Sequence, residues 1–183
     1  MANTSVQYNK AVKSCFDIFL KKNTDYGSAW RVLRTSSLTD QLYIKAKRIR
    51  QIEMTGASRV DEGILPEFIG IVNYSIMALV QLELGLSENL NLSREVTIEL
   101  YNKYIATAKL LMSNKNHDYD EAWREMRISS LTDLILQKIL RIKQIENNKG
   151  ETLISEGIDA NYLDMVNYSI FALIKMNEEE EKR

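Results

Sequence analysis

The chain contains one long stretch of sequence twice. "DYGSAWRVLRTSSLTD" begins at Asp25, and "DYDEAWREMRISSLTD" begins at Asp118. Residues 22–53 and 115–146 are identical at 19 of 32 positions without a gap. After one inserted residue, 62–79 and 156–173 agree at 10 of 18 positions. A fold for this chain must therefore place two copies of one pattern.

Two copies are too few for a solenoid, which usually needs three or more. The duplication instead predicts two related halves packed about a pseudo-twofold axis, like a homodimer fused into one chain. We place repeat one at 1–86 and repeat two at 87–183, and expect them to pack as a single globular unit. A homodimer of the whole chain is a further expectation.

The composition favours helices throughout. One proline and seven glycines occur in 183 residues, and apolar residues recur at helical spacing. We therefore predict an all-α fold, a helical bundle with three long helices in each repeat. A polar segment with Ala-Trp-Arg, itself a short helical turn, follows the first helix. The second helix should begin near "SSLTD", with Ser37 and Asp40 as a capping arrangement that Ser130 and Asp133 repeat. Expected helices cover 6–21, 37–54 and 66–84, then 94–114, 130–147 and 160–177.

Charge and cysteine content restrict the partners and the compartment. The formal net charge is -1, which provides no general attraction to nucleic acid or to an anionic membrane. The apolar run "FIGIVNYSIMALV" is too short to cross a bilayer, so no membrane partner is expected. Cys15 is the only cysteine, and the N-terminus lacks the apolar region of a secretion signal. These features predict a cytoplasmic protein.

Several polar side chains fall on apolar helix faces. Lys45 lies inside the apolar stripe of the second helix, with Arg48 beside it, and Lys138 and Arg141 repeat this arrangement. A charge that faces a core is costly unless it is paired or lines a wet pocket. The third helices carry polar residues at Asn73 and Asn167, and repeat two adds Asp164 on the same face.

Comparison of the copies separates residues that changed from residues that stayed. Apolar positions exchange freely, as cores allow when volume is rebalanced. Polar residues that stayed are expected to have specific partners. They are Asp25, Tyr26, Arg31, Arg34, Asp40, Lys45, Arg48, Glu53, Glu62, Asn73 and Tyr74, together with Trp30 and the counterparts of all these in repeat two.

Two interpretations of these residues are open. In the first, Asp118, Glu156 and Asp164 hold Mg²⁺, which prefers oxygen ligands, and they act catalytically with Asp25 and Glu62. In the second, Lys–Glu and Arg–Asp pairs clamp the two halves together. The aromatic residues belong either to the core or to a base-stacking site, and the arginines are either solvated or bound to phosphate.

The repeated pattern "KNxDYxxAWRxxRxSSLTD…KxxRIxQIE…EGI…VNYSIxAL" resembles a family named the nucleotide modification associated domain, found in bacteria and phages. The resemblance covers roughly 22–84 and 115–174 and implies a link to nucleotide metabolism or modified bases. The helical layout is also similar to MazG-type all-α nucleoside triphosphate pyrophosphohydrolases, which bind Mg²⁺ through ExxE and ExxD pairs. Here Lys45 and Arg48 occupy the second helix, and "DMVN" supplies one carboxylate.

The leading hypothesis is a helical protein that binds a small-molecule nucleotide and processes it with Mg²⁺ as cofactor. The alternative is a non-catalytic interaction module in which the repeated charges are structural. Under the first hypothesis, cations would meet phosphates and aromatic rings would frame the base. The residues assigned to nucleotide binding are Tyr26, Trp30, Arg34, Lys45, Arg48, Asn73, Tyr119, Trp123, Arg127, Lys138, Arg141 and Asn167.

Overall fold

The computed structural model describes residues 4–56, 63–90 and 92–183. These residues form helices joined by short turns and loops, with no strand among them, so the all-α prediction is confirmed. Each repeat has three long helices and a short 3₁₀ helix after the first of them. Repeat one contains α1 (Thr4–Tyr26), η1 (Ala29–Val32), α2 (Thr35–Thr55) and α3 (Leu65–Leu84). Repeat two contains α4 (Arg94–Tyr119), η2 (Ala122–Glu125), α5 (Ile128–Asn147) and α6 (Ile158–Glu181).

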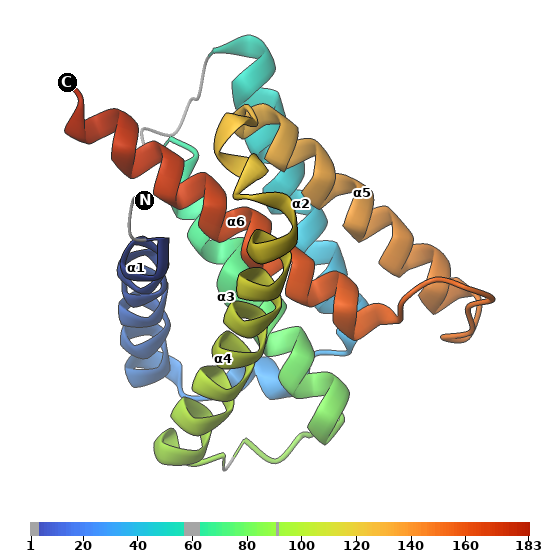
Figure 1. The fold of residues 1–183 in the computed structure, drawn as a ribbon. Helices are drawn as coiled ribbons and strands as arrows, with labels where there is room; N and C mark the ends of the chain where they lie inside the picture. Colours follow the sequence, from blue (N-terminus) through green and yellow to red (C-terminus); the bar gives the residue numbers. More distant parts are fainter. Residues whose placement is uncertain (1–3, 57–62, 91) are drawn as a thin grey trace.

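The helices are arranged in three layers of two. The third helices, α3 and α6, pack against each other at the centre (Figure 1). The first helices, α1 and α4, cover one side, while α2 and α5 pack together on the other. Every layer thus pairs one element of repeat one with its counterpart in repeat two. This is the pseudo-twofold arrangement that the duplication predicts.

The apolar stripes explain this layering. On α2, Leu38, Leu42 and Ile49 are fully buried, and the matching residues of α5 are equally buried. The central helix α3 is apolar on most sides, so it is covered by helices all round. Helix α3 is long and apolar enough to cross a membrane, although the apolar run "FIGIVNYSIMALV" within it is too short on its own. In the structure, 67% of its most apolar window is buried against the rest of the protein.

Helix ends differ from the prediction in two respects. The first helices continue to Tyr26 and Tyr119, so the Asp-Tyr pairs lie on their last turns. The second helices begin at Thr35 and Ile128, before the serines, and no side chain caps them. The predicted caps at Ser37 and Ser130 are therefore wrong. Both serines lie inside the first turn, because the extended arginine before each helix already redirects the chain.

Buried asparagines join the repeats across the central layer. Tyr101 on α4 donates a hydrogen bond to Asn73 Oδ1 at 2.8 Å, and Asn73 Nδ2 donates to the carbonyl of Cys15 on α1 at 3.0 Å. The pseudo-twofold repeats this arrangement in the second copy, with Tyr8, Asn167 and the Ala108 carbonyl. Because donor and acceptor of each amide are satisfied, these polar groups are tolerated in the core.

A second symmetric pair of hydrogen bonds links α2 with α5. The Thr39 hydroxyl lies 3.2 Å from Glu146 Oε1, and the Thr132 hydroxyl donates to Glu53 Oε1 at 2.8 Å. Burial raises the pKa of both glutamates. Glu53 and Glu146, which stayed unchanged between the copies, therefore bind threonines of the opposite repeat.

Candidate functional site

The first candidate site is a pocket of about 300 Å³ in repeat one, enclosed by α1, η1, α2 and α3. We call it inner pocket one. Apolar side chains form its walls, while lysine, tyrosine and asparagine side chains contribute its polar groups. Its lining consists of Ile18, Phe19, Lys22, Asn23, Tyr26, Gly27, Trp30, Lys45, Leu65, Pro66, Ile69, Gly70, Asn73, Tyr74 and Met77.

Two lysines bring positive charge to this pocket. Lys22 is exposed on α1, and within the described ranges it makes no ion pair. The ammonium of Lys45 lies 3.6 Å from Glu67 and 5.2 Å from the centre of the Tyr74 ring. Glu67 is bound more closely by Arg48, whose guanidinium donates to its other oxygen. Lys45 is therefore only partly neutralised, and an anion in the pocket would meet two cationic side chains.

The same region of repeat two forms a smaller pocket of about 200 Å³, which we call inner pocket two. Its main residues occupy the positions that line inner pocket one, with aromatic, lysine and asparagine side chains in register. It is lined by Lys115, Asn116, Tyr119, Ala122, Trp123, Asp164, Asn167, Tyr168 and Phe171.

Two substitutions reduce inner pocket two. Asp164 stands where repeat one has Gly70, and its carboxylate accepts from Lys115 at 2.8 Å and lies 2.7 Å from the Lys138 ammonium. Phe171 stands where repeat one has Met77, and its ring stacks on Trp123 with centroids 4.2 Å apart. Burial alone would lower the pKa of Lys115, but the Asp164 contact raises it overall. Inner pocket two is therefore narrower and already contains an anion.

The buried carboxylate of the third helix lies one helical turn further along the chain in repeat two than in repeat one. Repeat one has Glu67 and Gly70, whereas repeat two has Asn161 and Asp164 at these positions. A Cβ atom at Gly70 would lie 2.9 Å from Lys45 Cε, because Lys45 folds over the glycine. Each repeat thus keeps one buried carboxylate on its third helix. In repeat one this carboxylate pairs with Arg48 and Lys45, whereas in repeat two it pairs with Lys115 and Lys138.

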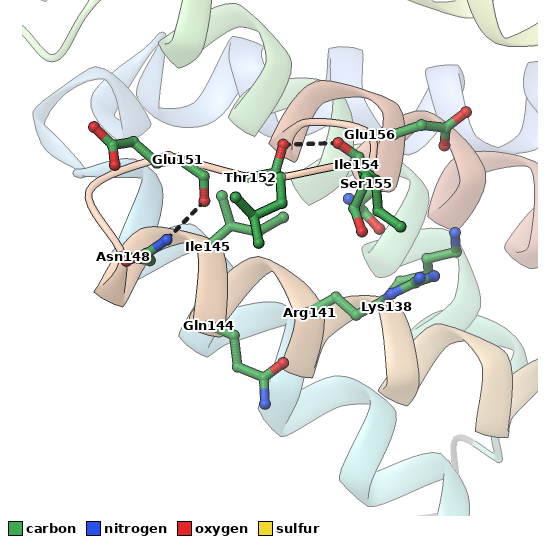
Figure 2. A pocket seen from close by; sticks show the side chains of 12 residues that line it. Lys138, Arg141, Gln144, Ile145, Asn148, Glu151, Thr152, Ile154, Ser155 and Glu156 are labelled. Carbon is green, nitrogen blue, oxygen red and sulfur yellow. Dashed lines mark hydrogen bonds between the residues drawn. The ribbon is translucent and has the colours of Figure 1, made fainter.

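The third cavity, about 660 Å³ and the largest of these three, lies between α5 and the loop that precedes α6 (Figure 2). We call it the outer pocket. Lys138, Arg141 and Glu156 line it, and hydrogen bonds from Asn148 and Thr152 hold the loop. Arg141 is exposed and has no ion pair within the described ranges, since Asn161 replaces the acid that binds Arg48 in repeat one.

The structure does not assemble the predicted magnesium ligands. Among the residues that the structure describes, no three Asp, Glu, His or Cys side chains are close enough to hold a metal ion. Asp164 is bound by two ammonium groups, and exposed Asp118 lies beside His117 at 3.3 Å. Glu156 lines the outer pocket. This donor set does not fit Mg²⁺, and magnesium binding stays a prediction.

The remaining predicted site residues are divided among the three pockets, apart from several that line none of them. Tyr26, Trp30, Lys45 and Asn73 come together in inner pocket one, and Tyr119, Trp123 and Asn167 in inner pocket two. Lys138 and Arg141 line the outer pocket. Arg34 and Arg127 are exposed at helix starts and line none of these pockets, and neither do Asp25 and Arg48. Glu62 lies outside the described residues.

Sequence reasoning omitted three pairs of pocket residues from the proposed site. Each pair is identical between the copies, and the pairs are Lys22 and Lys115, Asn23 and Asn116, and Tyr74 and Tyr168. Their identity across the repeats was the available signal. Each lysine lies on the first helix of its repeat, just beyond the predicted helix end at residue 21 or 114. It reaches its pocket because the helix continues to Tyr26 or Tyr119.

Comparison with known families identifies the repeated unit. The model of the nucleotide modification associated domain 1 family matches residues 22–82 and again 115–176, together well over half of the chain. Neither the curated proteins nor the solved structures contained a match. The similarity to MazG-type pyrophosphohydrolases stays a prediction.

Proposed function

This chain belongs to the nucleotide modification associated domain 1 family, and from that premise we propose that inner pocket one binds a nucleotide. One observation carries the proposal. The lysines equivalent to Lys22 and Lys45 hold a carboxylate in repeat two, whereas repeat one has Gly70 in place of that acid. Among the described residues, inner pocket one therefore pairs two lysines with apolar walls and has no carboxylate in the place of Asp164.

The lining of inner pocket one suits both parts of a nucleotide. Small-molecule sites are mostly apolar concave pockets of about 300 Å³ or more with a few placed polar groups. Phe19, Ile69 and Met77 provide apolar walls, and the rings of Tyr26 and Trp30 provide faces on which a base can stack. A phosphate would then meet the two lysine ammonium groups, which bind it as point charges.

We also propose that the bound nucleotide is processed with Mg²⁺, as a step separate from binding. Glu67, a carboxylate next to the pocket, is engaged by Arg48 and Lys45. We therefore propose binding as the primary activity and treat turnover as a separate measurement. Hydrolysis assays with and without Mg²⁺, run on whichever nucleotide binds, decide this point.

The binding test is a thermal-unfolding screen of the whole chain with ribonucleotides and deoxynucleotides, each with and without Mg²⁺. A ligand at about a hundred times its dissociation constant adds about 2.7 kcal/mol of stability, which raises Tm by about 5 °C or more. Lys45→Gln should remove the shift. Lys47→Gln, an exposed lysine outside the pocket, is the matched control and should retain it.

A second function, that of a non-catalytic interaction module, is favoured by a different observation. Several unchanged polar residues, including Asn73, Asn167, Glu53 and Glu146, hold the repeats together. A screen without any nucleotide-dependent shift would contradict the binding proposal and favour this module.

A further inference from the structure

We propose that inner pocket two is a second anion site that the protein closes with its own Asp164 carboxylate. The ligand class is a phosphate or pyrophosphate group, and its extension to nucleotides rests on the proposed function. The chain would then contain one open anion site and one closed anion site.

The geometry around Asp164 is that of a bound anion. Its two oxygens face two different lysines, Lys115 from α4 and Lys138 from α5, at 2.8 and 2.7 Å. Asp164 is 4% exposed and Lys138 is 8% exposed. Two ammonium groups that converge on one pair of oxygens form the kind of charge-assisted contacts that a phosphate oxygen accepts equally well.

The pseudo-twofold identifies what Asp164 replaces. Lys22 and Lys45 occupy the positions of these two lysines in repeat one and both line inner pocket one. The position of Asp164 is Gly70 there, so at this position repeat one has no side chain that reaches between the lysines. Among the described residues, Glu67 is the acid paired with Lys45, at 3.6 Å, and it is shared with Arg48. An anion from solution would therefore meet the same two lysines in repeat one, once the flexible end of Lys45 that lies over Gly70 moves aside.

Charge also explains why repeat two needs an internal anion. Lys138 is nearly buried, and a buried ammonium is costly unless it is paired. Asn161 cannot supply the charge that Glu67 supplies in repeat one. Asp164 therefore neutralises Lys115 and Lys138 without any bound ligand.

The test is the number of pyrophosphate ions bound per chain, measured by isothermal titration calorimetry. Asp164→Asn keeps the size of the side chain but removes its charge. It should bind one more pyrophosphate per chain than the unmodified protein. Adding Lys115→Gln to Asp164→Asn should weaken the new site about tenfold or more, since one charge-assisted contact is lost. An unchanged stoichiometry in a folded Asp164→Asn protein overturns the proposal.

A second variant covers the case in which Asp164→Asn does not fold. Asp164→Gly copies the residue that repeat one already accommodates, and pyrophosphate should raise its Tm more than that of the unmodified chain. If neither variant regains folding or stability with pyrophosphate, an anion cannot replace the carboxylate and the proposal is wrong. These measurements compare variants in pyrophosphate alone. They can therefore succeed even if the unmodified protein binds no nucleotide, and the proposed function can hold if they fail.

Discussion

Asp164 Oδ2 lies 2.7 Å from Lys138 Nζ, and both side chains are almost completely buried between α6 and α5. Its other oxygen accepts from Lys115 on α4. One carboxylate therefore ties together helices from all three layers of the bundle. In repeat one the equivalent lysine has only a longer contact with a shared glutamate.

Lys138→Met should destabilise the protein by about 2 kcal/mol. The substitution leaves Asp164 buried with Lys115 as its only cation, and breaking a fully buried pair typically costs about 3–5 kcal/mol. The remaining lysine reduces that cost. Chemical denaturation measures the difference. Lys10→Gln, which breaks an exposed pair with Glu181, is the control and should change little. A Lys138→Met protein as stable as the original would contradict a structural role for this pair.

Tyr101→Phe and Tyr8→Phe should lower the free energy of unfolding by similar amounts, about 1–2 kcal/mol each. Each substitution leaves the buried oxygen of one asparagine without its donor. Urea denaturation of the two single variants gives the comparison. Tyr104→Phe removes a hydroxyl bound to Glu83 at the surface and should have a much smaller effect. Unequal losses from the two buried tyrosines would contradict their equivalence about the pseudo-twofold.

Glu53 and Glu146 should make the stability of the protein depend on pH in a defined direction. Burial raises the pKa of both carboxyl groups in the folded state, partly opposed by a threonine hydrogen bond. Between the ordinary glutamate pKa, about 4.3, and the raised values, the folded protein holds more protons than the unfolded chain. Their contribution to stability therefore falls as pH rises through that window.

The double variant Glu53→Gln/Glu146→Gln tests this dependence. Glutamine can still accept from the threonine hydroxyls but does not ionise. Thermal unfolding across the acid-to-neutral range should show the original protein losing stability relative to the variant as pH increases. The nearby charges, Arg50 and Asp133 at Glu53 and Lys143 and Asp40 at Glu146, are the same in both proteins. A constant difference at every pH would mean that the folded pKa values are not raised.

Gly70→Asp should close inner pocket one in the way that Asp164 closes inner pocket two. The new carboxylate would neutralise Lys22 and Lys45, after a shift of the flexible Lys45 end that now lies against the glycine. Binding of any nucleotide that the screen identifies should weaken about tenfold or more. Gly70→Asn has the same size without the charge and is the matched control. If both variants weaken binding equally, the effect is steric and not electrostatic.

The sequence predicted the parts of the fold that depend on periodicity. The 3.6-residue pattern predicted three helices per repeat, and Leu38, Leu42 and Ile49 are buried as their spacing required. Helix ends were less predictable. Ser37 has the residue type of a cap but lies inside α2, because the extended Arg34 already starts the helix. Competing local signals of this kind differ by little free energy.

The polar residues that stayed unchanged between the copies divide in a way that no spacing could indicate. Asn73 and Glu53 bond to the opposite repeat, whereas Tyr26 and Lys45 line a pocket. Asp25 is exposed and lines none of the three pockets. All of these positions look alike in the sequence, because identity between copies reports that a residue has a role and not which partner it has.

By itself the sequence determined the helices, the duplication and the short set of polar residues that are identical in the two repeats. Each of these follows from local periodicity or from comparison of two copies within one chain. Only the tertiary structure decided that Lys115, Lys138 and Asp164 meet, since three helices must pack before the two ammonium groups and the carboxylate become neighbours. The same packing left Lys45 beside Gly70, so one pseudosymmetric fold contains an open pocket and a closed one.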